Sequence, residues 1–433
     1  MRRRGNPVQT NVAETSTLKS SEKVTPVVAT SAEATTSATS HATTITTGLI
    51  WVMTIACGLA EANQAYAQPL LADMGRSFGV SINEIGLTNT LSLFGYAVGL
   101  LLIVPLGEKY NQRRLIIVML GAVALALACM ATAPMVPLLL IASGMVGLTG
   151  IVSELIIPFA ARLTATSERG RVVGTVLCGL FLGAPLAGIL SGFIGKHFGW
   201  RTMYWIATTV MIILAVVLRL LLPADRSDKK ELHYLELLGS LWGLLRSEIV
   251  LQEVSILSFL VYGAFNAFWV TLSFSLSSSP YHFGSDVVGL FGLLSIVGPL
   301  VGLFVGKFTD HGDARYASGI ALVVIFLSFV FMWFVSQWLI GLLVGTILLS
   351  IGVQSSLVAN ETRIYRLHSG AWNRLNSIHI FLFVMGGSLG SMLGTLSWSI
   401  AKRDGVYATA CLLMLVALGF YIVPKNIAIS SNL

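Results

Sequence analysis

Residues 86–114 read GLTNTLSLFGYAVGLLLIVPLGEKYNQRR, and this stretch decides the fold. Its first part is predominantly apolar, and it is long enough to cross a bilayer as a helix, which takes about 20 residues. The stretch ends in the charged turn EKYNQRR, residues 108–114. We therefore expect a membrane helix with a charged exit.

The second half of the chain repeats this pattern. The segment LSLFGYAVGL at residues 91–100 reappears as LSIVGPLVGL at residues 294–303. The copy also runs into a charged turn, GKFTDHGDAR at residues 306–315. A membrane helix repeated with its exit in both halves is typical of transporters that arose by internal duplication.

The composition requires a membrane environment for most of the chain. Charged residues make up 11% of the 433 residues and hydrophobic ones 55%, whereas soluble proteins carry about 25% charged residues. The net charge of +7 could suggest a nucleic-acid partner, but the placement of the basic residues indicates membrane topology instead. The four cysteines lie far apart in apolar runs, so they predict neither a disulfide framework nor a metal site.

We expect an all-α integral membrane protein with twelve transmembrane helices in two pseudosymmetric six-helix bundles. The expected spans are residues 47–70, 86–107, 115–133, 137–162, 171–195, 202–222, 251–275, 286–306, 315–335, 337–360, 374–400 and 405–424. With both termini cytoplasmic, five of the 27 Lys and Arg fall outside, namely Arg76, Lys196, Arg201, Lys402 and Arg403, which leaves 22 inside. This asymmetry follows the positive-inside rule.

The remaining segments complete the expected organisation. Residues 1–46 are rich in Ser and Thr and lack an apolar core, so they predict a disordered cytoplasmic tail rather than a signal peptide. Two bundles, residues 47–223 and 251–425, flank a cytoplasmic linker at 224–250, and a short tail follows at 426–433. The linker contains ELHYLELLGSLWGLL, which predicts either an interfacial amphipathic helix or a solvated segment with a hydrophobic patch.

The first span is unusually polar for a membrane helix. Glu61, Gln64 and Gln68 follow one another at i, i+3 and i+7, so they share one face. When the first and seventh spans are aligned on the Phe-Gly pair that follows each, Asn266 takes the place of Glu61. A polar residue at this point of both halves predicts a central cavity.

Two carboxylates are expected well inside the membrane, Glu61 and Glu154. A charged group there costs about 2.5–3.5 kcal/mol on insertion scales, so such residues are functional by default. We expect both to couple transport to protons. Alternatively, Glu154 lies near enough to the inner end of its span to reach cytoplasmic water and plays no coupling role. His379 is a further titratable group, although a lone histidine near a helix end is more often structural.

Other residues are candidates for solute binding and for gating. Gln64, Gln68 and Asn266 could orient a polar group, and Tyr262 and Trp269 could stack on an aromatic or cationic solute, unless they are packing residues. In the charged turns, ion pairs could hold the inner face closed, unless these turns are only solvated topology signals. The gate candidates are Glu108, Lys109, Arg113, Arg114, Asp310 and Arg315.

Glycines recur at helical spacing in the fifth and eleventh spans. Gly179, Gly183 and Gly188 give the fifth span a face of small residues, and Gly386, Gly390 and Gly394 do the same in the eleventh. Such faces predict close contact between membrane helices.

Twelve spans in two repeated halves, with a charged turn after spans two and eight, resemble the major facilitator superfamily. The family's loop signature, G-x-x-x-D-[RK]-x-G-[RK]-[RK], is matched at Glu108, Lys109, Arg113 and Arg114, but Val104 and Asn111 replace its glycines. The segments YAQPLL (66–71), IIPFAARL (156–163), SERGRVVGTV (167–176) and NRLNSIHI (373–380) are similar to the bacterial efflux permeases labelled drug or sugar exporters. The resemblance covers about residues 50–425.

Two departures weaken the antiporter assignment within that family. Many proton-driven exporters have an arginine in R-x-x-x-G of span four, where this chain has Ser143 before Gly147. The antiporter run G-P-x-x-G-G appears only as APLAGI at residues 184–189.

The resemblance and the residues together imply a secondary transporter rather than an enzyme. We expect proton-coupled efflux of a small organic solute by a monomer in the bacterial inner membrane. No cofactor, metal or nucleic-acid partner is expected, and no P-loop pattern indicates ATP as the energy source. The alternatives are an importer of the same fold and a membrane receptor or scaffold that has lost transport.

Overall fold

The computed structural model describes residues 46–165, 167–223, 239, 243–311, 313–367 and 372–422, with the side chains at 108–109, 303, 307–311 and 372–373 excepted. The expected tails and most of the expected linker, including most of its amphipathic run, lie outside this part. Every regular element among the described residues is a helix. The prediction of an all-α class is therefore confirmed.

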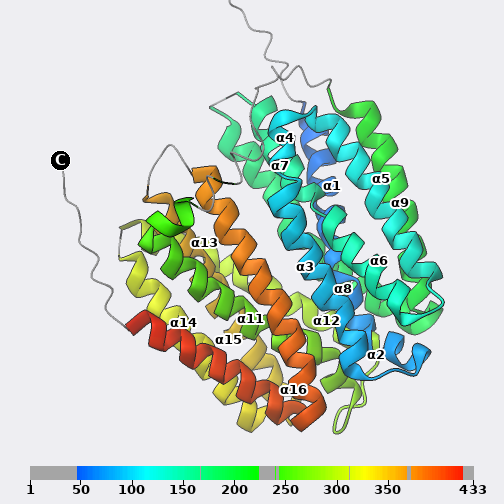
Figure 1. Ribbon diagram of the computed structural model, residues 1–433, viewed down its shortest axis with the longest axis vertical. Coiled ribbons are helices and arrows are strands. Elements are labelled where there is room, and N and C mark those ends of the chain that lie inside the picture. The colour runs from blue at the N-terminus through cyan, green and yellow to red at the C-terminus, as the bar shows by residue number, and fades with distance from the viewer. Residues whose placement is uncertain are drawn as a thin grey trace, which may run out of the picture. The chain divides into compact units, whose positions relative to one another are not determined.

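Nine helices form the first half of the described chain (Figure 1). They are α1 (Thr47–Ala65), α2 (Ala67–Phe78), α3 (Ile82–Leu102), α4 (Leu106–Lys109), α5 (Gln112–Thr132), α6 (Val136–Thr149), α7 (Val152–Leu163), α8 (Arg169–Phe198) and α9 (Trp200–Leu221). The second half contains α11 (Ile249–Ser277), α12 (Ser285–Phe291), the 3-10 helix η1 (Gly292–Ile296), α13 (Val297–His311), α14 (Ala314–Val335), α15 (Leu339–Tyr365) and α16 (Trp372–Ile422).

Ten helical segments among the described residues are long and apolar enough to cross a membrane. The segment Arg374–Ile422 has 49 residues, which is long enough to cross a membrane twice. The backbone is not helical at Ala401 and Lys402, so the two crossings meet at a kink there. Helices α1 and α2 supply the remaining expected span, whose polar residues lower its hydropathy. The twelve expected spans are thus accounted for.

The first expected span and its outer loop were wrong in detail. The helix is interrupted at Tyr66, and α2 continues to Phe78, so the gap expected between the spans 47–70 and 86–107 shrinks to the three residues before α3. Pro69 explains the interruption, because it has no N–H to donate to the carbonyl of Ala65. Gly79 ends α2 with a φ of 65°, a left-handed conformation that favours glycine.

The fourth expected span is also broken, into α6 and α7. The break falls at Gly150 and Ile151. A Cβ atom at Gly150 would lie 2.7 Å from the side-chain nitrogen of Gln64, so a larger residue here would displace that side chain. The sequence predicted one continuous helix because the apolar run is continuous.

Close helix packing at the predicted glycine faces is confirmed. Gly179 and Gly183 of α8 lie against backbone atoms of Thr54 and Gly58 in α1. Gly390 and Gly394 of α16 lie in the same way against Gly263 and Ala267 of α11. The helix pairs α1–α8 and α11–α16 therefore approach to backbone contact, as small residues permit.

Each half has its own apolar core. The larger cluster of buried side chains draws mainly on α1 to α9, and a second cluster draws on α11 to α16. The halves meet through α8 with α12, α3 with α16, and α2 with α11. Figure 1 shows α3 beside α16 where the two groups of helices adjoin.

Candidate functional site

Glu61 and Glu154 come together in the interior of the first half, although they lie 93 positions apart in the chain. The hydroxyl of Ser153 donates to the carboxylate of Glu61 at 3.3 Å. The hydroxyl of Tyr96 donates to the carboxylate of Glu154 at 3.3 Å. Because Ser153 precedes Glu154 in the chain, its bond to Glu61 brings the two carboxyl groups into the same part of the interior.

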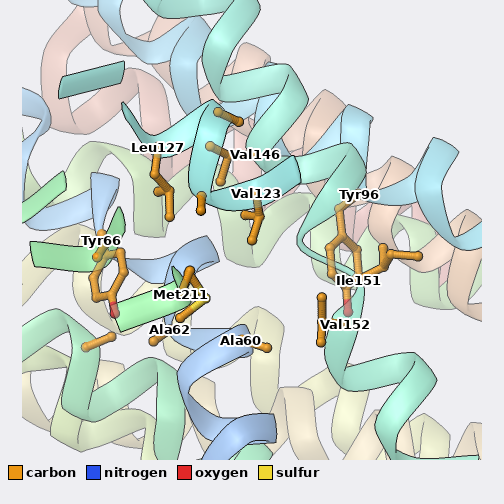
Figure 2. Close-up of a cluster of buried hydrophobic side chains, with 14 of the residues drawn as sticks. Ala60, Ala62, Tyr66, Tyr96, Val123, Leu127, Val146, Ile151, Val152 and Met211 are labelled. Carbon is orange, nitrogen blue, oxygen red and sulfur yellow. The ribbon is translucent and has the colours of Figure 1, made fainter. Parts of the chain in front are cut away.

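The surroundings of this pair are apolar, and both carboxyl side chains are only half-buried. Figure 2 shows Tyr96, Ile151 and Val152 lying together, with Ala60 of α1 nearby. Ile151 and Val152 are fully buried. The break between α6 and α7 puts Ser153 and Glu154 in the first turn of α7. Broken membrane helices with polar groups at the break are typical of substrate and ion sites in transporters.

The two glutamines predicted to bind solute, Gln64 and Gln68, make different contacts. Gln64 accepts a hydrogen bond from Ser92 at 3.0 Å, and its buried amide nitrogen has no hydrogen-bond partner among the described residues. Gln68 donates to the backbone carbonyl of Trp269 at 3.0 Å. Gln68 therefore joins the two halves of the molecule.

A third carboxylate within a long apolar helix, Glu361, was missed from the sequence. It is half-buried in α15. It was not a candidate because span ten was ended at residue 360, whereas α15 continues to Tyr365. The polar run NET at residues 360–362 ended the apolar signal without ending the helix.

Aromatic rings of α11 and α16 form a stack in the second half. Tyr262 stacks on Phe383 with centroids 3.9 Å apart and on Phe265 at 5.8 Å. Phe265 stacks in turn on Trp269 at 5.3 Å. We call Phe383, Tyr262, Phe265 and Trp269 the ring stack.

The side chain of Asn266 packs between α11 and α16, and its role in solute binding stays a prediction. Its side chain is buried, donates to the carbonyl of Tyr262 at 3.0 Å and lies against Gly387 of α16. His379 of α16 is fully buried, and neither of its ring nitrogens has a hydrogen-bond partner among the described residues.

The charged turns make contacts inside their own halves. The guanidinium group of Arg113 donates to the carbonyl of Arg219 at the end of α9. The backbone N–H of Arg114 donates to the side chain of Asn111, which caps α5. The side chains of the candidates Glu108, Lys109 and Asp310 lie outside the described residues. Their gating role stays a prediction.

Arg315 takes part in a buried ion cluster that the sequence did not reveal. Glu253 of α11 is 1% exposed and lies 3.3 Å from Arg315 and 3.1 Å from Arg363. Arg315 also donates to the carbonyl of Tyr421. Glu253 is the third residue of the expected seventh span. A carboxylate so close to the end of a span is expected to reach water, so the sequence did not indicate its burial.

Bonds between the halves gather at the end of the molecule that contains Gly79 and Lys402. There Lys196 of α8 pairs with Asp286 of α12 at 2.7 Å. Thr90 of α3 donates to Ser391 of α16 at 3.2 Å. Further cross-half bonds join Asn83 to Ser399, Asn89 to Ser391, Ser388 to Thr90 and Ser285 to Gly192. We call this set of contacts the closing interface.

The sequence model of the Major Facilitator Superfamily matches residues 50–395. The chain belongs to this family. The uncharacterized transporter YgaY of Escherichia coli (strain K12) is 34% identical over 364 residues, which cover 84% of this chain and 91% of that protein. The bicyclomycin resistance protein homolog of Haemophilus influenzae is 24% identical, over 83% of this chain and 92% of that protein.

Solved structures of other superfamily members share the fold. A bacterial homolog of the human lysosomal transporter Spinster, in an inward-facing and unoccupied conformation, superposes with a TM-score of 0.72 at 16% identity over 86% of this chain and 95% of that one. The xylose transporter XylE of E. coli, in an inward-open conformation, gives 0.64 at 13% identity over 88% and 97%. This member of the superfamily is accordingly a multi-pass membrane transporter.

Proposed function

We propose that this superfamily member exports a small organic solute across the bacterial inner membrane in exchange for protons, as a monomer with both termini in the cytoplasm. The observation that carries the proposal is the pair Glu61–Glu154. Two interacting carboxylates at a break in a membrane helix can bind and release protons, and carboxylates at membrane depth are retained mainly for function.

Alternating access supplies the transport step. The closing interface joins the halves at the end that contains Gly79, which the distribution of basic residues assigns to the outside. The solute binds from the cytoplasm and displaces protons from Glu61 and Glu154. Separation of the closing interface then releases the solute outside, and protons bind again.

Efflux is favoured over import by the resemblance of the chain to exporters. The bicyclomycin resistance protein homolog, which aligns over most of its length, carries a name that indicates resistance to an antibiotic. An importer of the same fold is the second candidate, because direction depends on the coupling ion and the gradients. A non-transporting receptor or scaffold would have no reason to keep Glu61, Glu154 and Glu361 in its interior.

Growth and flux measurements test the proposal in sequence. A bacterial strain depleted of its own exporters would express the protein and be challenged with a panel of cationic, neutral and anionic antimicrobials. Compounds to which it gives resistance would be added to proteoliposomes that contain a pH-sensitive dye. Solute-dependent proton movement, lost in Glu61→Gln, is expected. Solute movement with no proton movement would refute proton coupling.

A further inference from the structure

We propose that the two halves of the molecule deform differently during transport. The second half turns as one rigid body, whereas in the first half α1 shifts against α5 and α7 and takes Glu61 away from Ser153. This inference rests on the proposed alternating access and adds to it the element that moves. The difference comes from side chains at equivalent positions of the two halves, at the end opposite the closing interface.

The duplication makes α14 the equivalent of α5. Arg113 of α5 donates to the carbonyl of Arg219, and Arg315 of α14 donates to the carbonyl of Tyr421. Both bonds span 106 residues of the chain, and both tie the start of a helix to the end of the last helix of its half. Arg315 therefore takes the place of Arg113.

Two further pairs of helices correspond in the same way. Helix α11 is the equivalent of α1, with Asn266 in the place of Glu61, by the alignment on the Phe-Gly pairs. Helix α15 is the equivalent of α7, because each has an arginine in its last turn, Arg363 and Arg162. Each position of α11, α14 and α15 can therefore be compared with a position in the first half.

In the second half, a buried layer of hydrogen bonds joins three helices. Asn360 of α15 is fully buried and accepts a hydrogen bond from Ser318 of α14 at 2.9 Å. The amide nitrogen of Asn360 donates to Ser258 of α11 at 3.1 Å. Both serines are buried as well. One amide side chain thus links α11, α14 and α15.

The ion cluster forms a second layer between the same helices. Glu253 of α11 is bound between Arg315 of α14 and Arg363 of α15. All three residues lie nearer than the first layer to the start of α11 and α14 and to the end of α15, so the two layers are stacked along the helices. We call the two layers together the inner brace.

The first half has no such brace among the described residues. The positions equivalent to the hydrogen-bonded layer are Met53 of α1, Ile116 of α5 and Phe159 of α7, and all three are apolar and fully buried. Glu253 falls on Gly48, which has no side chain. In the described part of the chain, no side chain of α1 before Glu61 forms a hydrogen bond or ion pair with α5 or α7.

This difference decides which helix can shift. Moving α11 against α14 and α15 would break buried hydrogen bonds and leave the carboxylate of Glu253 without its partners, which is costly inside a protein. Apolar contacts have no preferred direction, so α1 can slide over Ile116 and Phe159 while these side chains stay buried. The inner brace therefore makes the second half the stiffer one.

The helix that is free to shift is the one that contains Glu61. The bond from Ser153 links Glu61 to α7, and it must break when α1 moves. Gly183 of α8 packs against the backbone of Gly58, so α8 follows α1. A shift of α1 thus changes the surroundings of the carboxylate proposed to bind the proton, whereas Asn266 on α11 keeps its neighbours.

Distances between spin labels on the full chain in lipid nanodiscs test the inference. In a variant without the native cysteines, labels at Trp51→Cys and Val118→Cys report the position of α1 against α5. Labels at the equivalent positions, Ile256→Cys and Ile320→Cys, report the position of α11 against α14. All four side chains are exposed in the described structure, so labels should not disturb the packing.

A charge reversal opens the closing interface for this measurement. Lys196→Asp puts a second carboxylate opposite Asp286 and should drive the halves apart. Labels at the exposed positions Ser77→Cys and Ile400→Cys, one in each half, record this opening. Arg76→Asp is the matched control, because it reverses a charge whose partner lies on the same helix.

We expect a different response from the two inner pairs of labels. In Lys196→Asp the distance between the labels at 51 and 118 should shift by about 2–5 Å, as helices do in other switching proteins. The distance between the labels at 256 and 320 should stay the same within error. No distance should change in Arg76→Asp.

Two variants of α15 test the inner brace itself. Asn360→Leu removes the hydrogen-bonded layer, so in the Lys196→Asp background the distance between 256 and 320 should now shift too. Thr346→Val also removes a buried polar group, but its hydroxyl bonds to Leu342 of the same helix, so this distance should not shift. Melting curves will show that each variant is folded.

Three outcomes would overturn the inference. They are an unchanged distance between 51 and 118 when the outer labels separate, an equal shift of both inner pairs in Lys196→Asp, and no effect of Asn360→Leu. Outer labels that never separate would refute the closing interface and the inference with it. Distances that change as expected, without proton movement in proteoliposomes, would leave the unequal deformation intact and refute the proposed coupling.

Discussion

The hydroxyl of Ser153 donates to the carboxylate of Glu61 across 3.3 Å, and this contact ties the broken fourth span to the first. Ser153 can make this bond because α7 starts at Val152, beside the Gly150 break. The arrangement brings a proton-binding group, a helix break and the neighbouring Glu154 to one place in the fold.

Neutralising Glu61 should uncouple transport from the proton gradient. Glu61→Gln keeps the size of the side chain and its hydrogen bond with Ser153 but cannot lose a proton. We expect solute exchange down its own gradient to continue in proteoliposomes, while accumulation driven by a pH gradient is lost. Ser143→Ala, a change in α6 away from the pair, is the control. Full proton-driven accumulation in Glu61→Gln would move the coupling role to Glu154 or Glu361.

Adding one methyl group at the helix break should disturb the site. In Gly150→Ala the new Cβ would lie 2.7 Å from both the Gln64 amide nitrogen and the Val146 carbonyl oxygen, so Gln64 must move. Overpacking of this kind costs about 1–3 kcal/mol. We expect slower transport with a modest loss of thermal stability. Gly121→Ala, where no atom lies within 4 Å of the new Cβ, should transport normally; equal loss in both variants would contradict a specific role for the break.

Cross-linking the closing interface should stop the transport cycle. Thr90 and Ser391 are joined by a hydrogen bond of 3.2 Å between α3 and α16, so cysteines at both positions are near enough for a disulfide after a small adjustment. Oxidation of Thr90→Cys/Ser391→Cys should abolish transport, and a reductant should restore it. Each single-cysteine variant is the control. Unchanged transport by the cross-linked protein would mean that this interface does not need to separate.

The ion cluster around Glu253 should be critical for stability. Arg363→Met leaves the fully buried carboxylate with only the half-exposed Arg315 as a partner. Removing one partner of a buried ion pair costs about 3–5 kcal/mol. Thermal unfolding in detergent should show a large loss for Arg363→Met and a smaller one for Arg315→Met. If Arg315→Met is equally damaging, its contact with Tyr421 rather than burial of the charge dominates.

Labelling with a membrane-impermeant thiol reagent will test the orientation. In a variant without the four native cysteines, a cysteine at position 80 should react from outside and one at position 230 only after the membrane is opened. The expectation follows from the distribution of basic residues. Labelling of position 230 in intact cells would reverse the topology and with it the direction of the proposed cycle.

The sequence by itself determined the membrane class, the duplicated halves and the glycine faces of spans five and eleven. It also indicated Glu61, Glu154 and Tyr262 as candidate site residues. Each of these is a local or periodic property, because apolar length, helical spacing and small residues act within one span. The same reasoning failed where a polar run ended the apolar signal but not the helix, as it did at Glu361.

Only the tertiary structure decided which of these residues meet. The bond between Ser153 and Glu61, the break at Gly150, the stacking of Phe383 on Tyr262 and the burial of Glu253 between two arginines all join different helices. Hydropathy gives no rotation or depth for one helix relative to another. Those quantities are set by close packing between helices, which depends on the shapes of many side chains at once.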